Sequence, residues 1–263
     1  MDFIRRMRPM LGTFVEAGAC SSAGLPALDA AFAALQSAQQ RWSFQDPASE
    51  LTRINASDGA WVTVHTDTVR LLRLARGMML ASGGYFDFTL GGAQVQRGSL
   101  PDHGGKPAME RGDVHDVELR AGAVRLRRPV RLVLDGIAKG FAADLACRAM
   151  RRAGASSGWI NAGGDIRVFG EVDLPLSLRG EDGGIRLYGT LRNAAFASSQ
   201  VAATSDGTFP ADIVGAAGLA PQLGVWSVLA RSAWRADALT KVAAIAPSEE
   251  RADLLERLKG QLV

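Results

Sequence analysis

Residues 134–144 (LDGIAKGFAAD) contain the side chains best placed to bind an anion. An apolar run ends at Asp135, Gly136 permits a sharp turn, and a helical pattern begins near Ala138 with Lys139 in its first turn. The free N–H groups of a helix N-terminus and an adjacent lysine together favour a bound phosphate. The alternative interpretation is an ordinary strand, turn and helix that carries a lysine on its surface.

Two further glycine turns are candidates for ligand contact. Residues 161–166 (NAGGDI) include Gly163 and Gly164, whose turn either directs backbone N–H groups at a ligand or closes a β-hairpin. Residues 83–89 (GGYFDFT) place Asp87 and Thr89 two positions apart, on one face of an extended segment. The alternative there is a turn in which the aspartate side chain bonds to the nearby backbone.

Asp237 and Lys241 lie four residues apart in a helical pattern, so they share one face of that helix. Their alternative interpretation is an exposed ion pair worth about half a kcal/mol or less. Lysine occurs only at positions 106, 139, 241 and 259 of a chain whose positive charge is otherwise arginine. Two of these four lysines therefore fall in segments that we consider for function.

The histidines and cysteines argue against several classes of site. His65, His103 and His115 are dispersed, and none has a partner at the spacing of a metal site or a catalytic triad, so we expect exposed histidines. Cys20 and Cys147 are far apart and form no CxxC pair, which disfavours a metal cluster or a disulfide framework. The glycine, lysine and Ser/Thr pattern of a P-loop is absent.

The composition fits one globular domain over residues 1–263. The net charge is only +3, and the arginines form no continuous basic stripe accompanied by aromatic residues, which make up 6% of the chain. We therefore expect no nucleic-acid partner. No signal peptide or membrane-spanning run is evident, so we expect a cytoplasmic protein without a membrane anchor.

The hydrophobic pattern predicts an α+β fold with mixed, largely antiparallel sheets and segregated helices. Helices are expected over residues 25–42, 49–54, 66–82, 138–153, 236–244 and 249–258, with Ser49 and Thr66 as N-caps. Strands are expected over residues 13–18, 61–64, 117–120, 123–126, 131–134, 158–161, 166–169, 176–179, 185–188, 194–197 and 225–230. Residues 91–113 show no periodicity and are expected to form a loop or flap.

Six segments, taken in order, resemble motifs of the ApbE family of FAD:protein FMN transferases. They are residues 8–13 (RPMLGT), 42–55 (WSF and SELTRIN), 84–89 (GYFDFT), 136–144 (GIAKGFAAD), 161–170 (NAGGDI with Gly170) and 236–239 (ADAL). The resemblance extends from about Arg8 to Ala244. No single motif is specific, but six in the same order are difficult to reach by chance.

The resemblance implies a Mg²⁺-dependent reaction in which FMN is transferred from FAD to a Thr or Ser hydroxyl of a target flavoprotein, with release of AMP. Phosphoryl transfer of this kind depends mainly on placement and charge neutralisation. The residues implied at the FAD site are Leu11, Phe44, Asp87, Lys139, Gly163 and Gly164. The carbonyl of Gly136 and the carboxylate of Asp237 are implied as Mg²⁺ ligands.

The sequence departs from the family pattern near the reacting groups. Lys241 stands where a threonine is often found, and an ammonium group cannot ligate Mg²⁺ but can replace part of its charge. The H-x-x-D-P-x-T-G stretch, expected near residues 212–219, is missing. Asp212 is therefore the candidate catalytic base, and Lys139 is the other residue to which we assign a catalytic role. The A-T-S-G element is reduced to residues 197–200 (ASSQ).

Because of these departures, two alternatives to an active transferase stay open. One is an FAD-binding or FAD-hydrolysing relative that does not modify protein. The other is a structural or interaction protein, without catalysis, on the same scaffold.

Overall fold

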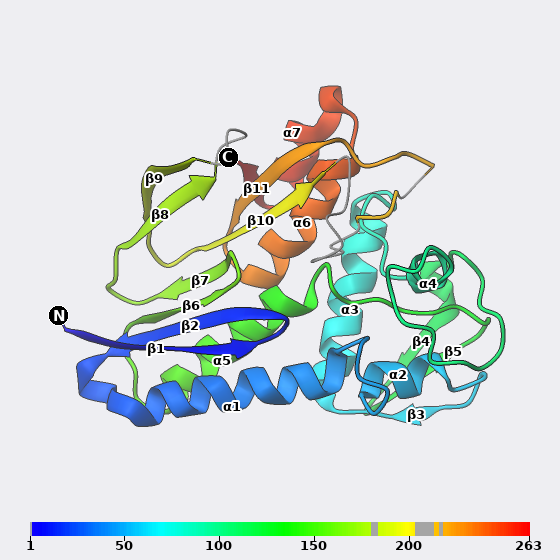
Figure 1. The fold of residues 1–263 in the computed structure, drawn as a ribbon, viewed down its shortest axis with the longest axis horizontal. Coiled ribbons are helices and arrows are strands. Elements are labelled where there is room, and N and C mark those ends of the chain that lie inside the picture. Colours follow the sequence, from blue (N-terminus) through cyan, green and yellow to red (C-terminus); the bar gives the residue numbers. More distant parts are fainter. Residues whose placement is uncertain (1, 180–183, 203–212, 216–217) are drawn as a thin grey trace.

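The computed structural model describes residues 2–179, 184–202, 213–215 and 218–263. Its largest element is a seven-stranded sheet in the order β1-β2-β6-β7-β10-β11-β12, and each neighbouring pair is antiparallel (Figure 1). The strands are β1 (Phe3–Met10), β2 (Thr13–Cys20), β6 (Gly158–Ala162), β7 (Asp165–Phe169), β10 (Ala195–Val201), β11 (Gly224–Ala230) and β12 (Gly260–Leu262).

Three helices cover this sheet and provide most of the core. They are α1 (Gly24–Trp42), which contacts β1 and β2, α5 (Ala138–Arg152), which contacts β6 and β7, and α6 (Ala233–Ile245), which contacts β10 and β11. Helix α5 lies between α1 and α6 and contacts both. A fourth helix, α7 (Ser248–Arg257), packs against α6 and β12. The buried face of α1 contains Leu28, Ala31, Phe32, Leu35 and Ala38, which is the helical spacing in the sequence.

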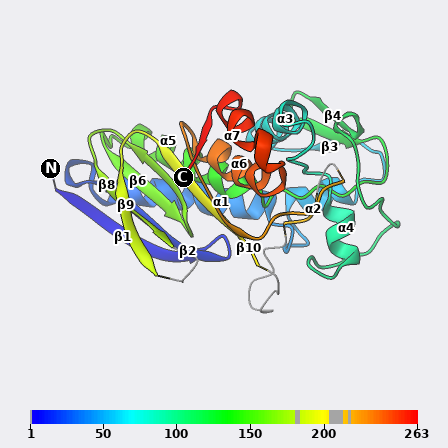
Figure 2. The same ribbon diagram turned by 90° about the horizontal axis from the view of Figure 1, so that it is seen from above.

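A smaller group of elements lies at one end of the molecule, on the right of Figure 1. It contains a three-stranded sheet of β3 (Val62–Thr63), β5 (Ala123–Leu126) and β4 (Val117–Arg120), with α2 (Glu50–Asn55), α3 (Thr66–Ala81) and α4 (Gly91–Gln96). The hairpin of β8 (Leu174–Arg179) and β9 (Ile185–Leu191) lies at the opposite end, as Figure 2 also shows. Two short 3₁₀ helices span Ser21–Ala23 and Val114–Asp116.

The α+β class and the antiparallel sheets are confirmed. The predicted helices are present within a few residues of their expected bounds, and the Ser49 hydroxyl caps α2 by accepting a hydrogen bond from the Thr52 N–H at 3.0 Å. The Gly163–Gly164 turn closes the β6–β7 hairpin, and both glycines have positive φ, as in two-residue hairpin turns of type I′. The three histidines are exposed, and both cysteines are free.

The strand predicted over residues 131–134 is wrong. Only an isolated bridge between Leu90 and Arg131 is formed there. The Asn55 side chain explains the difference, because its amide donates to the Leu132 carbonyl at 2.9 Å and accepts from the Leu132 N–H at 2.7 Å. A side chain therefore satisfies the backbone groups that a neighbouring strand would otherwise pair.

Three other expectations need correction. Residues 91–113 are not all loop, because α4 forms where Gly91 and Gly92 lie against the backbone of Arg131 and Met109. The cap of α3 is His65 rather than Thr66, with the His65 Nδ1 accepting from the Asp67 N–H at 3.1 Å. Strands β1 and β12 were not predicted, because edge strands bury only part of their length and show weak alternation.

Helices α5 and α6 meet at a contact that requires glycine. A Cβ atom added to Gly140 would lie 2.2 Å from the backbone oxygen of Ala233, at the start of α6. In the next turn of α5, the Asp144 carboxylate accepts hydrogen bonds from the N–H groups of Ala233 and Trp234 at 3.2 and 3.0 Å. Asp144 thus caps α6 from a neighbouring helix, and Gly140 permits the close approach.

Within the described residues, no helix is both long enough and apolar enough to cross a membrane.

We expect Gly140→Ala to destabilise the protein by about 1–3 kcal/mol, because the added methyl group meets backbone atoms that cannot move alone. Gly77→Ala is the matched control, since Gly77 is also helical but has open space around it. The control should leave stability unchanged or raise it by up to about 1 kcal/mol. Urea unfolding of both variants tests this, and an equal response of the two would contradict the proposed contact.

Candidate functional site

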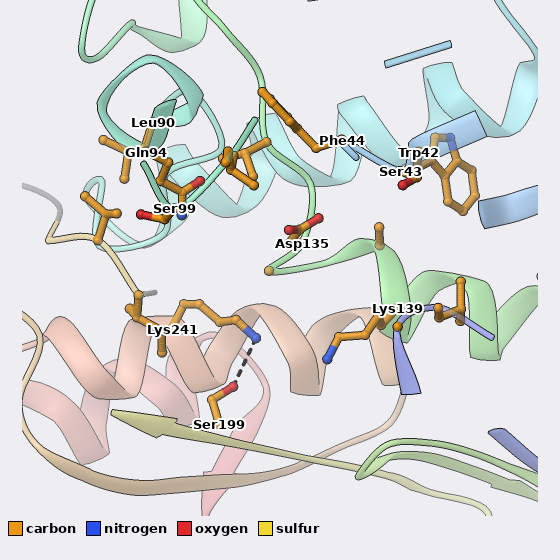
Figure 3. A pocket seen from close by; sticks show the side chains of 18 of the residues that line it. Trp42, Ser43, Phe44, Leu90, Gln94, Ser99, Asp135, Lys139, Ser199 and Lys241 are labelled. Atoms are coloured by element: carbon orange, nitrogen blue, oxygen red, sulfur yellow. Dashed lines mark hydrogen bonds between the residues drawn. The ribbon is translucent and has the colours of Figure 1, made fainter. Parts of the chain in front are cut away.

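A cavity of about 560 Å³ opens where the two groups of elements meet, within the range of roughly 300–1,000 Å³ that is common for small-molecule sites. Its walls come from the β1–β2 turn, the end of α1, residues 85–87, the start of α5, β10 and α6. Figure 3 shows Phe44 and Leu90 on one side, Lys139 and Lys241 on the other, and Asp135 between them. The cavity therefore has a wall of mixed apolar and polar side chains facing a floor with two lysines.

The rim of the cavity is formed by two tight hairpin turns. In the β1–β2 turn, Leu11 has φ of 55°, a left-handed conformation that is uncommon for a leucine. Its N–H donates to the Gln39 side chain at 2.8 Å, which holds the turn against α1. Gly163 of the β6–β7 turn lies so close to Thr13 that an added Cβ would be 2.6 Å from the threonine hydroxyl. The two turns thus position each other.

Two predicted FAD-site residues, Phe44 and Asp87, lie in the wall. The Phe44 ring packs near His103, with ring centroids 5.9 Å apart, and its carbonyl lies 2.7 Å from the His103 Nε2. The Asp87 Oδ1 accepts hydrogen bonds from the N–H and hydroxyl of Thr89 at 2.8 and 2.6 Å, so the turn interpretation of this segment is correct. The Asp87 Oδ2 accepts from the Arg111 Nε at 2.7 Å. Asp87 therefore shapes the wall mainly through internal bonds.

Lys139 forms one end of the charged floor and is not an ordinary surface lysine. Its Nζ lies 3.4 Å from the Oδ2 of Asp165, whose side chain is buried. The charge of the Asp165 carboxylate raises the pKa of Lys139, so the lysine stays protonated at neutral pH. Burial raises the pKa of Asp165 to about 6. The pair holds an ammonium group at the cavity, at the first turn of α5.

Lys241 and Asp237 form the other end of the floor, and the interpretation of this pair as exposed is wrong. Asp237 is fully buried, and its Oδ1 accepts from the Lys241 Nζ at 2.6 Å. The other oxygen, Oδ2, accepts from the Gly140 N–H at 3.1 Å. Lys241 also donates to the Ser199 hydroxyl at 3.1 Å (Figure 3), and that hydroxyl lies 2.7 Å from the Thr240 hydroxyl.

Asp135 is a site residue that the sequence did not single out. Its side chain is exposed to the cavity and, among the described residues, makes no hydrogen bond. The surrounding walls limit its hydration and raise its pKa, while Lys139 opposes that effect. An acidic residue directly before the Gly136 turn was the only signal in the sequence.

The structure brings most of the predicted site residues to one cavity. Leu11, Phe44, Asp87, Gly136, Lys139 and Gly163 line it. Gly164 is the neighbour of a lining residue, and its N–H donates to the Asn161 side chain at 3.0 Å. Asp237 lies beneath the floor rather than on it. Asp212 lies outside the described residues, so its proposed role as a base stays a prediction.

The donor set between Gly136 and Asp237 does not fit a magnesium ion as the structure stands. Both carboxylate oxygens of Asp237 already accept hydrogen bonds, one of them from an ammonium group. The Lys241 side chain lies against Gly136, where an added Cβ would be 3.3 Å from the lysine Cε. In the described part of the chain, no group of three His, Cys, Asp or Glu side chains is arranged to hold a metal.

Comparison with known proteins identifies the family. The profile of the ApbE family matches residues 11–263, and the chain belongs to this family. No curated protein matches the sequence.

Solved structures share the fold. The apo form of the flavinyl transferase ApbE from Pseudomonas stutzeri has a TM-score of 0.78 at 17% identity, covering 97% of this chain and 88% of that one. The flavin transferase ApbE from Vibrio cholerae has a TM-score of 0.78 at 17% identity, with coverages of 97% and 91%. The ApbE protein from Thermotoga maritima has a TM-score of 0.76 at 21% identity, with coverages of 99% and 93%.

We expect the buried charges of the floor to give a specific pH dependence of stability. The pKa of Asp165 is about 6 in the folded protein, against an ordinary value of 3.8, because burial and the charge of Asp237 favour its protonated form more strongly than Lys139 and Lys241 oppose it. Between these values the folded chain holds a proton that the unfolded chain has released. Its contribution to the free energy of unfolding therefore falls as pH rises from about 4 to 6.

Urea unfolding over this pH range checks the prediction. Asp165→Asn should remove this component of the slope, whereas Asp253→Asn, at an exposed position of α7, should keep it. An unchanged slope in Asp165→Asn would place the proton on another group.

Proposed function

We propose that this protein is an FAD:protein FMN transferase, which moves FMN from FAD to a Thr or Ser hydroxyl of a target flavoprotein and releases AMP. The observation that carries the proposal is a cavity lined by residues from five of the six family-like segments, with two lysine ammonium groups on its floor. Membership of the ApbE family and the fold shared with flavin transferases support it.

The chemistry of the walls matches the parts of FAD. The apolar side includes Trp42, Phe44, Phe86 and Leu90, which suit a planar ring system. The opposite side presents the ammonium groups that a diphosphate needs. Transfer of a phosphoryl group places charge on the oxygens around phosphorus, and fixed cations that stabilise this charge lower the barrier. In this proposal Lys139 binds the diphosphate directly.

The reaction itself is tested with purified protein, FAD and a flavoprotein subunit that carries an acceptor Thr or Ser. We expect flavin to remain on the subunit after denaturation, together with released AMP. FMN and AMP without covalent flavin would instead support the FAD-hydrolysing alternative. No binding of FAD in a fluorescence titration would reject both and leave a protein without this catalysis.

Lys139→Ala should weaken FAD binding roughly 10- to 100-fold, the loss that corresponds to one hydrogen bond with a charged group. The measurement is the Kd for FAD by quenching of flavin fluorescence. Lys106→Ala is the matched control, because Lys106 pairs with Asp58 at an exposed position and does not line the cavity.

Lys139→Ala leaves the buried Asp165 carboxylate without its partner, which can destabilise the fold. The double variant Lys139→Ala/Asp165→Asn removes this unpaired charge and serves as the control for a folding defect. An unchanged Kd in a folded variant would contradict the phosphate role of Lys139.

A further inference from the structure

Lys241 is held at the cavity by two hydrogen bonds, unlike a lysine on the open surface. Its ammonium group bonds to the buried Asp237 carboxylate at 2.6 Å and to the Ser199 hydroxyl at 3.1 Å. Its side chain is only 19% exposed, and what is exposed faces the cavity that it lines. An ammonium group has three N–H donors, so these two bonds leave one for a ligand.

The network beneath Lys241 is built to keep the ammonium in place. Asp237 is fixed by the Gly140 N–H on its other oxygen, and the Thr240 hydroxyl lies within 2.7 Å of both the Asp237 carbonyl and the Ser199 hydroxyl. These bonds come from α5, α6 and β10, so three elements of the core fix the position of one charge. A side chain held in this way loses little further freedom when an anion binds.

The same atoms disfavour a divalent cation at the position between Gly136 and Asp237. The Lys241 stem packs against Gly136, and its charge neutralises the Asp237 carboxylate. A second cation there would meet a carboxylate whose two oxygens each already accept a hydrogen bond, and an ammonium group of like charge.

We propose that the Lys241 ammonium serves as the resident cation of the FAD site, so that the diphosphate of FAD is bound without a divalent metal. This inference rests on the proposed function, because it names the group that neutralises the diphosphate at that site. Lys241 and Lys139 point toward each other from α6 and α5 across the cavity floor (Figure 3). The two ammonium groups then flank the diphosphate from both sides.

The test is an FAD titration, followed by flavin fluorescence and calorimetry, with protein in excess EDTA and with protein in excess magnesium chloride. We expect the same Kd in both conditions. Binding that is lost in EDTA and restored by magnesium would overturn the inference while leaving the proposed function intact. An absence of FAD binding in both conditions would overturn the proposed function and this inference with it.

Variants separate the lysine from a metal. Lys241→Thr frees the Asp237 carboxylate, so FAD affinity in EDTA should fall roughly 10- to 100-fold and recover in part with magnesium. Wild-type affinity of this variant in EDTA would overturn the inference. Lys106→Thr makes the same change of net charge at an exposed position outside the cavity and should bind FAD as the wild type does.

The double variant Lys241→Thr/Asp237→Asn leaves no unpaired charge at the buried Asp237 position, so it controls for a folding defect of Lys241→Thr. Circular dichroism checks that both variants are folded. It has neither the ammonium nor the carboxylate, so its FAD affinity should be low with and without magnesium. Tight binding by this variant in EDTA would overturn the inference.

Discussion

The close contact between α5 and α6 at Gly140 is the constraint on which the rest of the site depends. Because this residue has no Cβ, the backbone at the start of α6 reaches the first turn of α5. The Gly140 N–H can then bond to Asp237, and Asp144 can cap α6. A larger residue would separate the helices and, with them, the two lysines that form the cavity floor.

Two buried carboxylates hold these lysines, and this explains how a small cavity can keep positive charge in place. Isolated buried charges are costly, but Asp165 with Lys139 and Asp237 with Lys241 each form a paired group at the edge of the core. The desolvation cost is met during folding rather than during binding. A ligand with a diphosphate then meets donors that need little reorganisation, which is the physical basis of electrostatic preorganisation.

The cavity also explains why the family motifs are dispersed along the chain. The β1–β2 turn, the end of α1, the start of α5, the β6–β7 turn and α6 each contribute one part of the wall. The antiparallel order of the large sheet brings the two hairpin turns together, where Thr13 packs on Gly163. These two turns are distant in sequence but adjacent in space because β2 pairs with β6 in the sheet.

The sequence by itself determined the helices, most strands, the glycine turns and the family, because these follow from local periodicity and residue type. It also identified Lys139, Asp237 and Lys241 as candidates. Only the tertiary structure decided that Asp237 is buried under Lys241, that Asp144 caps another helix, and that Asp135 faces the cavity. Local spacing shows which side chains share a face, but the distant segments that pack on that face decide whether a charge is exposed, paired or presented to a ligand.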